Sequence, residues 1–271
     1  MPSTPQETNP ASAFDALAET YDVDFTGSRT AEFLRQTVHS RLDTLVRSGD
    51  QALEFGCGTG VDAKYLSERG VNVLATDASP KMLHIAAERL SASPNVTLAA
   101  LNLNELPADT PQLNGLFDLV FANFGVMNCA NDLVVLAGWL AERVRPGGYA
   151  AFAIMSRYCI WETSWHALHG EFKTAGRRWR RAPITFETDS GAIALQYPTV
   201  KQLKRAFSPY FEKRKVMPLG LFLPPSDIFG VVEKRKRLYR RLSDMENTFR
   251  SSGWLANYAD HYWIEFQRVE S

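Results

Sequence analysis

Residues 53–60 read Leu53-Glu54-Phe55-Gly56-Cys57-Gly58-Thr59-Gly60, and Asp77 ends the next apolar stretch, residues 71–77. The apolar residues before Gly56 predict a buried parallel strand, and the glycines predict a tight turn into a helix. Glycine lets the backbone approach a ligand closely, and a carboxylate at the tip of the following strand can accept both hydroxyls of a ribose. The pairing of this loop with Asp77 therefore predicts a nucleotide-type cofactor site.

The spacing of the glycines separates two classes of cofactor site. Dinucleotide-binding proteins carry G-x-G-x-x-G, in which the third glycine allows close packing of the helix over a pyrophosphate. Val61 occupies that sixth position here, which disfavours a nicotinamide dinucleotide. The segment instead resembles the first motif of the class I S-adenosylmethionine (SAM)-dependent methyltransferases, an acidic residue followed by G-x-G-x-G.

Three later segments resemble the same family and occur in the family's order. Residues 101–107 are similar to the third-strand segment, where Asn102 stands in place of the aspartate that usually accepts the adenine amino group. The amide oxygen of Asn102 can still accept a hydrogen bond. Residues 117–126 look like the fourth strand and its active-site edge, and residues 144–152 like the turn into the fifth strand.

Strand and helix patterns alternate over residues 50–156 and predict an α/β fold with a parallel, doubly wound sheet. The resemblance implies a Rossmann-like sheet of seven strands whose last strand is antiparallel. Our candidates for the sixth and seventh strands are residues 212–219 and 262–269. Helices are expected over residues 12–18, 30–46 and 132–144, and another begins at Ser79-Pro80.

The resemblance also implies which residues bind SAM. Asp77 would take the ribose hydroxyls, and Glu54 would order the loop or a water that holds the SAM amine. Tyr21 resembles a tyrosine that covers the methionyl end in many small-molecule members, although a core aromatic fits the sequence equally well. The full implied set is Tyr21, Glu54, Gly56, Cys57, Gly58, Gly60, Asp77, Ala78, Met82, Asn102, Leu103, Asn123 and Phe124.

The segment 157–169 is the most suggestive one for the substrate and predicts a helix. Four-residue spacing puts Trp161, Trp165 and His169 on one stripe. The same spacing puts Glu162 under His166, so that a carboxylate could orient a histidine base. We therefore take His166, Glu162 and His169 as catalytic candidates; the alternative is a lid helix with tryptophans in the core and a Glu–His pair on the surface.

A second apolar cover is expected over residues 217–225, which end in two prolines. Leu221 and Phe222 in this stretch would line a substrate pocket together with Trp161 and Trp165, or the stretch packs as a loop on the end of the sheet. His261 begins the expected last strand, and we interpret it as structural.

Composition fits one domain with embellishments. The chain has 271 residues, 45% of them hydrophobic, which is enough for one full core. We expect a flexible N-terminal arm over residues 1–11 and a single domain over 12–271, with cap segments at about 157–200 and 220–260. The three cysteines have no metal-ligand spacing, so neither a structural metal nor disulfides are expected.

Charge is unevenly distributed although the formal net charge is zero. Residues 171–250 hold 18 lysines and arginines against 8 aspartates and glutamates, with dense basic runs at 177–181 and 234–241. We interpret these runs mainly as solvated helix faces. We see no RNA-binding module or aromatic platform in the sequence, so a nucleic-acid partner is not expected.

The sequence thus predicts a SAM-dependent methyltransferase that acts by in-line displacement on a small aromatic or apolar acceptor, at oxygen, nitrogen or carbon. Two alternatives stay open: a non-catalytic SAM-binding regulatory protein, and a methyltransferase that uses the basic 171–250 region to bind RNA. No apolar run approaches the roughly 20 residues of a membrane helix, and residues 1–10 lack a signal peptide's apolar stretch. We expect a cytoplasmic protein, monomeric or homodimeric.

Overall fold

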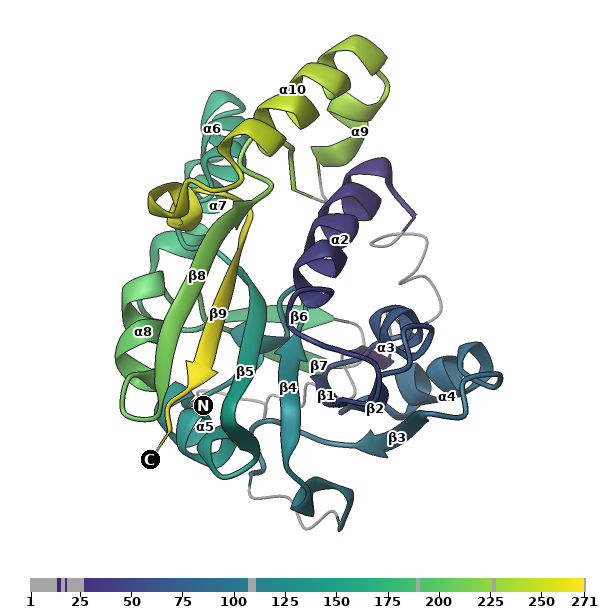
Figure 1. Cartoon of the computed structure of the whole chain (residues 1–271). Helices are drawn as coiled ribbons and strands as arrows, with labels where there is room; N and C mark the ends of the chain where they lie inside the picture. Colours follow the sequence, from purple (N-terminus) through teal and green to yellow (C-terminus); the bar gives the residue numbers. More distant parts are fainter. Residues whose placement is uncertain are drawn as a thin grey trace.

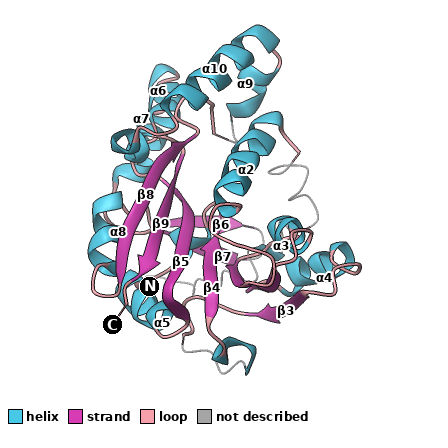
Figure 2. Ribbon diagram, in the orientation of Figure 1, coloured by secondary structure: helices cyan, strands magenta, loops and turns pink. Residues whose placement is uncertain are grey.

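A seven-stranded sheet forms the centre of the molecule, flanked by helices on both faces (Figures 1 and 2). This computed structural model describes residues 14–15, 18, 27–106, 111–188, 191–225 and 228–270. The strands of the sheet are β1 (Gln51–Phe55), β2 (Asn72–Asp77), β3 (Val96–Ala100), β4 (Phe117–Ala122), β5 (Val144–Met155), β8 (Phe211–Leu219) and β9 (His261–Arg268). A separate hairpin comprises β6 (Ile184–Thr188) and β7 (Gly191–Leu195).

The order of the strands is β3-β2-β1-β4-β5-β9-β8. Strands β1 to β5 pair in parallel, and β9 lies antiparallel to both β5 and β8. The predicted seven-stranded Rossmann-like fold is therefore confirmed, including its antiparallel last strand. The candidates for the sixth and seventh strands correspond to β8 and β9 within one residue at each end.

Two apolar clusters, one on each face of the sheet, fill the three layers. On one face, α5 (Leu133–Ala141) and α8 (Val200–Phe207) pack on side chains such as Phe152 and Phe266. On the other face, α2 (Arg29–Leu42), α3 (Val61–Ser67) and α4 (Pro80–Arg89) pack on Phe121 and Trp263. Central strands covered on both faces need apolar side chains at successive positions, and residues 52–55 of β1 are all buried.

Side-chain caps fix where several helices begin. Ser79 accepts a hydrogen bond from Met82 N at the start of α4, as the Ser79-Pro80 pair predicted. Asp132 caps α5 in the same way, accepting from Val134 N and Val135 N at 2.8 and 3.0 Å. The predicted helix over 132–144 extends too far, because the chain leaves α5 at residue 141 and enters β5 at residue 144.

The helices of both predicted cap segments lie beyond the end of the sheet toward which β4 points (Figure 1). The first contains α6 (Ile160–Leu168), α7 (Phe172–Ala175), the 3₁₀ turn η4 (Arg177–Trp179) and the β6–β7 hairpin, which the sequence did not predict. The second contains α9 (Phe229–Glu233), α10 (Lys236–Phe249) and the 3₁₀ turn η6 (Gly253–Tyr258). Shorter 3₁₀ turns, η2 (Pro111–Asn114) and η3 (Val126–Cys129), flank β4.

Several expectations concern parts of the chain that the structure leaves undescribed. The predicted N-terminal arm, residues 1–11, lies outside the described residues, and so does Tyr21. Of the predicted helix over 12–18, Phe14 and Asp15 are helical. The helix predicted over 30–46 is α2, which ends four residues earlier. Within the described ranges, no helix is long and apolar enough to cross a membrane.

The cap of α5 gives a first testable prediction. Asp132→Ala should lower the free energy of unfolding by about 1 kcal/mol, because the backbone N–H groups of Val134 and Val135 lose their acceptor. Urea denaturation at pH 7 measures this change, and Asp132→Ser, which restores a capping oxygen, should recover most of it. An alanine variant as stable as the wild type would show that solvent satisfies these N–H groups equally well.

Candidate functional site

The glycine-rich loop leaves β1 with positive φ angles at each of its glycines. Gly56, Gly58 and Gly60 have φ of 61°, 52° and 81°, a region that residues with a Cβ rarely adopt. A Cβ on Gly56 would lie 2.4 Å from a methyl carbon of Val126, the first residue of η3, so the loop passes very close to the turn that follows β4. A Cβ on Gly60 would lie 2.9 Å from Leu90 Cδ1, which gives this glycine a role in packing α3 against α4.

Asp77 ties the glycine loop to the turn that follows β2. Its Oδ2 accepts from Gly58 N at 2.9 Å and its Oδ1 from Ser79 N at 2.8 Å. Burial raises the pKa of this carboxyl, which is 8% exposed, although the backbone N–H groups oppose the shift. Each carboxylate oxygen has a second lone pair, so Asp77 can hold the loop and still accept hydroxyls from a ligand.

A buried ionic cluster lies next to this loop and centres on Asp62 of α3. Its carboxylate pairs with Arg35 and His39 of α2, each at 2.7 Å, and accepts from Asn123 Nδ2 at 2.8 Å. Burial alone would raise the pKa of Asp62, but Arg35 and His39 outweigh it and hold the pKa below its ordinary value. The cluster therefore joins α2, α3 and the end of β4 and fixes the orientation of the Asn123 amide.

Two buried acceptors beside this cluster have no hydrogen-bond partner in the described part of the chain. They are Oε2 of Glu54, in β1, and Oδ1 of Asn123, one residue beyond β4. Burial, and then the nearby Asp62 carboxylate, raises the pKa of Glu54 well above its ordinary value. A buried acceptor without a partner is costly, so this pair of oxygens fits a ligand that brings N–H donors, above all a cationic amine.

The next residue, Phe124, has a strained backbone. Its φ of 47° makes it the one non-glycine residue with a positive φ in the described ranges. Such strain is concentrated at functional sites, where the surrounding structure holds it in place. The ring of Phe124 contacts the guanidinium of Arg35, 5.2 Å from its centroid, and the imidazole of His261, whose centroid is 5.6 Å away.

The remaining predicted cofactor residues surround the turns after β2 and β3. Met82 is fully buried, Cys57 is buried in the loop, and Ala78 and Leu103 are half-buried. The amide of Asn102 is already engaged: its oxygen accepts from Asn104 N and its nitrogen donates to Glu105. Asn102 thus shapes the turn after β3, and one lone pair of its oxygen remains for a ligand.

Comparisons with known proteins agree with this geometry. A family model described as a methyltransferase domain matches residues 53–150. The chain is 34% identical over 168 residues to a malonyl-[acyl-carrier protein] O-methyltransferase of Pectobacterium atrosepticum, a match that covers 60% of each chain. It is 30% identical over 204 residues to the enzyme of that name from Pseudescherichia vulneris, covering 69% of this chain and 76% of the relative. The chain belongs to the class I SAM-dependent methyltransferases.

A solved structure shows the same fold at low sequence identity. The CcbJ methyltransferase of Streptomyces caelestis aligns with a TM-score of 0.61 and 16% identity, covering 96% of this chain and 99% of that one. The fold described above is therefore shared with that structure over almost the whole length of both chains.

The pairing of Glu162 with His166 in the cap of this methyltransferase, predicted from their spacing, is wrong. Glu162 instead receives two hydrogen bonds from Arg177, at 2.7 and 2.9 Å, and pairs with Arg178 at 2.6 Å. His166 pairs through Nδ1 with the exposed Glu171, at 2.5 Å. The four-residue spacing on α6 was real, but two arginines from η4 outcompete a histidine for a buried carboxylate because they bring permanent charge.

Three of the four predicted pocket residues come together in a groove of about 410 Å³. Trp161 of α6 lines this groove together with Leu221 and Phe222 of the loop after β8. Trp165 is not among the lining residues; its ring stacks on that of His169, with centroids 4.4 Å apart. The remaining lining residues are Ile160, Ser164, Leu242 and Leu255. The groove lies wholly within the cap and includes no residue of the glycine loop.

The sequence analysis did not identify the residue that holds the loop after β8 in place. Glu246 of α10 is buried, and its carboxylate accepts from the backbone N–H groups of Gly220, Leu221 and Phe222 at 2.8 to 3.1 Å. Burial raises the pKa of Glu246 against the effect of these donors. The only sequence signal was a glutamate on the apolar side of an otherwise basic helix.

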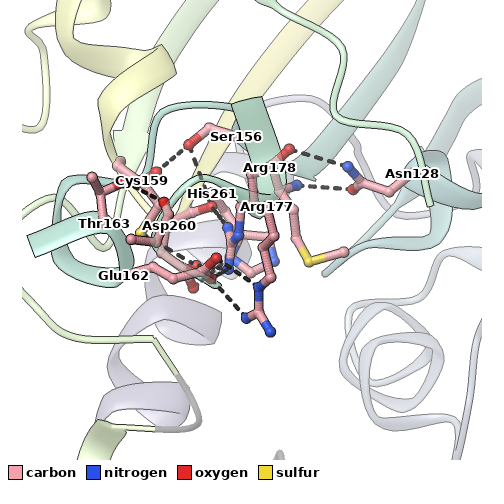
Figure 3. Close-up of polar contacts among 12 residues, drawn as sticks. Asn128, Ser156, Cys159, Glu162, Thr163, Arg177, Arg178, Asp260 and His261 are labelled. Atoms are coloured by element: carbon pink, nitrogen blue, oxygen red, sulfur yellow. Dashed lines mark hydrogen bonds and ion pairs between the residues drawn. The ribbon is translucent and has the colours of Figure 1, made fainter. Parts of the chain in front are cut away.

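A second buried ionic group joins the cap to the start of β9, and Figure 3 shows its contacts. Arg178 pairs with Glu162 on one side and with Asp260 on the other, at 3.0 Å, and Asp260 accepts from Nδ1 of His261 at 3.0 Å. The basic run 177–181 was interpreted as a solvated face, but Arg178 is only 6% exposed. At this position the interpretation is wrong, because Arg178 has two buried carboxylate partners.

Within the described ranges, no group of three His, Cys, Asp or Glu side chains is placed to hold a metal ion.

The two buried aspartates predict how stability responds to acid. Burial would raise the pKa of Asp260, but His261 and Arg178 lower it below its ordinary value, as Arg35 and His39 do for Asp62. The unfolded chain therefore takes up protons near pH 4 that the folded methyltransferase does not bind. The contribution of these two aspartates to the free energy of unfolding should be fully retained above about pH 5 and fall as the pH drops below about 4, by up to about 1.4 kcal/mol per pH unit for each group.

Urea unfolding at pH values from 5 to 2.5 measures this slope. In Asp260→Asn the slope should be shallower than in the wild type by about 1 kcal/mol per pH unit. Asp244→Asn, a substitution of an exposed residue on α10, serves as the matched control and should keep the wild-type slope. Equal slopes in all three proteins would contradict the proposed ionisation of Asp260.

Proposed function

We propose that this protein transfers the methyl group of SAM to a small-molecule acceptor with an apolar or aromatic body. The observation that carries the proposal is the meeting of the glycine loop, Asp77 and the two unpartnered acceptors of Glu54 and Asn123 at one edge of the sheet. SAM offers a ribose diol for the carboxylate and a protonated amine for the two acceptors. A dinucleotide offers no cationic amine.

Each part of the donor has residues suited to it. The backbone of the glycine loop would approach the methionyl and ribose portions closely, and Asp77 would accept the ribose hydroxyls. Ala78, Met82 and Leu103 provide apolar surface for the adenine, and Glu54 and Asn123 would accept from the amine. When bound, SAM supplies a sulfonium whose methyl carbon is a strong electrophile, so the protein's contribution is largely positioning, which can supply roughly 7–11 kcal/mol.

The cap supports a small apolar acceptor. The groove between Trp161, Leu221 and Phe222 is of ligand size, and its walls come from both cap segments. The names of the two relatives are those of O-methyltransferases, which favours oxygen as the methylated atom. Arg178 does not favour an RNA substrate, because its charge is already paired with the buried carboxylates of Glu162 and Asp260.

The first test is cofactor binding. Calorimetric titration should give micromolar binding of SAM and S-adenosylhomocysteine and none of NADH. Asp77→Ala should weaken SAM binding by roughly 10- to 100-fold, since hydrogen bonds to a charged group contribute about 1.5–3 kcal/mol. Asp132→Ala, at the other face of the sheet from α3 and α4, is the control and should bind SAM like the wild type. Absence of SAM binding, or tight NADH binding, would refute the proposal.

The groove provides a separate test of the acceptor. A library of aromatic and alkyl acceptors incubated with methyl-labelled SAM, with products detected by mass spectrometry, should yield methylated compounds with an apolar body. For such a compound, Trp161→Ala should raise KM by about tenfold, since it removes a large apolar contact, while the dissociation constant of SAM stays the same. An unchanged KM would exclude this groove as the acceptor site, and exclusively hydrophilic acceptors would refute the proposed substrate class.

A further inference from the structure

His261 occupies the edge of the sheet at which the predicted donor site lies. It is the first residue of β9 and pairs in register with Met155, the last residue of β5, and with Leu219, the last residue of β8. Because β9 runs antiparallel to its neighbours, its first residue lies beside their carboxyl ends. Those ends, together with the end of β4 at Asn123, form the edge where open α/β sheets bind ligands.

His261 contacts the aromatic ring of Phe124, the residue that follows Asn123. The rings of His261 and Phe124 meet edge to face, with centroids 5.6 Å apart and an interplanar angle of 80°. The guanidinium of Arg35 lies over the same Phe124 ring and pairs with Asp62, which holds the Asn123 amide. The Phe124 ring, which follows a strained backbone, thus contacts both the ionic cluster beside the predicted donor site and the imidazole of His261.

The surroundings of His261 select one tautomer. Nδ1 contacts the Asp260 carboxylate at 3.0 Å, which puts the proton of the neutral ring on Nδ1 and leaves the lone pair on Nε2. Asp260 is held in turn by Arg178 at 3.0 Å. Among the described residues none makes a hydrogen bond to Nε2 of His261. A carboxylate that orients a histidine with its other nitrogen available is the arrangement that general bases use.

The histidines selected from the sequence lack this combination. His166 is paired with Glu171, which is more than half exposed, and both residues belong to the α6–α7 segment of the cap. His169 stacks on Trp165 and contacts the Trp165 carbonyl oxygen through Nδ1. His261 contacts the Phe124 ring, lies at the start of β9 and has a buried carboxylate partner in Asp260.

We infer that His261 is the general base of the methyl transfer and takes a proton from an acceptor hydroxyl through Nε2. The inference rests on the proposed function and narrows its substrate class to acceptors that are protonated at neutral pH. The acceptor oxygen forms a bond to the methyl carbon of SAM while the carbon–sulfur bond breaks. The electron pair of the broken carbon–sulfur bond stays on sulfur, which gives S-adenosylhomocysteine. The hydroxyl proton moves to Nε2, and Asp260 stabilises the resulting imidazolium.

Proximity of His261 to the sulfonium can be measured without an acceptor. SAM carries a positive charge on sulfur that S-adenosylhomocysteine lacks, and this charge disfavours protonation of a nearby imidazole. In NMR spectra of protein labelled with ¹³C and ¹⁵N at its five histidines, the His261 signal is assigned as the one lost in His261→Gln. Titration from pH 5 to 9 then gives the protonated fraction of the ring in each complex.

Besides the sulfonium, the charged groups around the His261 ring are Asp260, which contacts it, and Arg178, which pairs with Asp260. Arg35, which contacts the Phe124 ring, and Glu162, which pairs with Arg178, lie one contact further away. They are the same in both complexes, so the comparison isolates the charge of the ligand. We expect the protonation of His261 in the SAM complex to be displaced to lower pH by about half a pH unit or more relative to the S-adenosylhomocysteine complex. His84, exposed on α4, is the internal control and should titrate alike in both.

The outcomes separate the inference from the function on which it rests. If both ligands bind but His261 titrates identically in the two complexes, or keeps one protonation state throughout, the inference is wrong and the proposed function stands. If neither ligand binds, both fail. In Asp260→Asn the protonated fraction of His261 should fall at every pH in both complexes, because the imidazolium loses its carboxylate; an unchanged titration would remove Asp260 as its positioning residue.

Discussion

Parallel pairing of β1 with β2 on one side and with β4 on the other is the constraint on which the site depends. It brings the glycine loop, Asp77 and Asn123, which lie far apart in the chain, to one edge of the sheet. Asp77 then bridges the loop and the turn after β2, and Asp62 bridges two helices and the end of β4. The proposed donor site is therefore built by strand register first and by buried carboxylates second.

Much of this could be predicted because its signals are local in the sequence. The glycine loop, the N-cap at Ser79 and the apolar strands each lie within about ten residues, and the chain order of the motifs sets the topology. The predicted bounds of the last two strands differ from those of β8 and β9 by no more than one residue at each end. The apolar residues Trp161, Leu221 and Phe222 could be grouped in advance because apolar covers at the ligand-binding edge have few other places to pack.

The ionic groups of the cap could not be predicted because their partners are distant and several candidates compete. Glu162 had a histidine at helical spacing, yet it bonds arginines fifteen and sixteen residues away. Glu246 binds backbone N–H groups, which no side-chain pattern reveals. Asp260 and Arg178 are 82 residues apart, and the basic run around Arg178 resembles an ordinary solvated face. Burial of charge is decided by the tertiary arrangement, which a local pattern does not contain.

The groove in the cap has walls from two insertions, α6 after β5 and the loop and α10 after β8, whereas the glycine loop, Asp77 and Asn123 come from the first half of the chain. Mutations that reshape the groove therefore need not touch the residues proposed to bind SAM. Such a division allows the sequence of one half of a protein to change while the sequence of the other half is conserved. Paralogues of this chain would then diverge in acceptor choice mainly through changes in those two insertions.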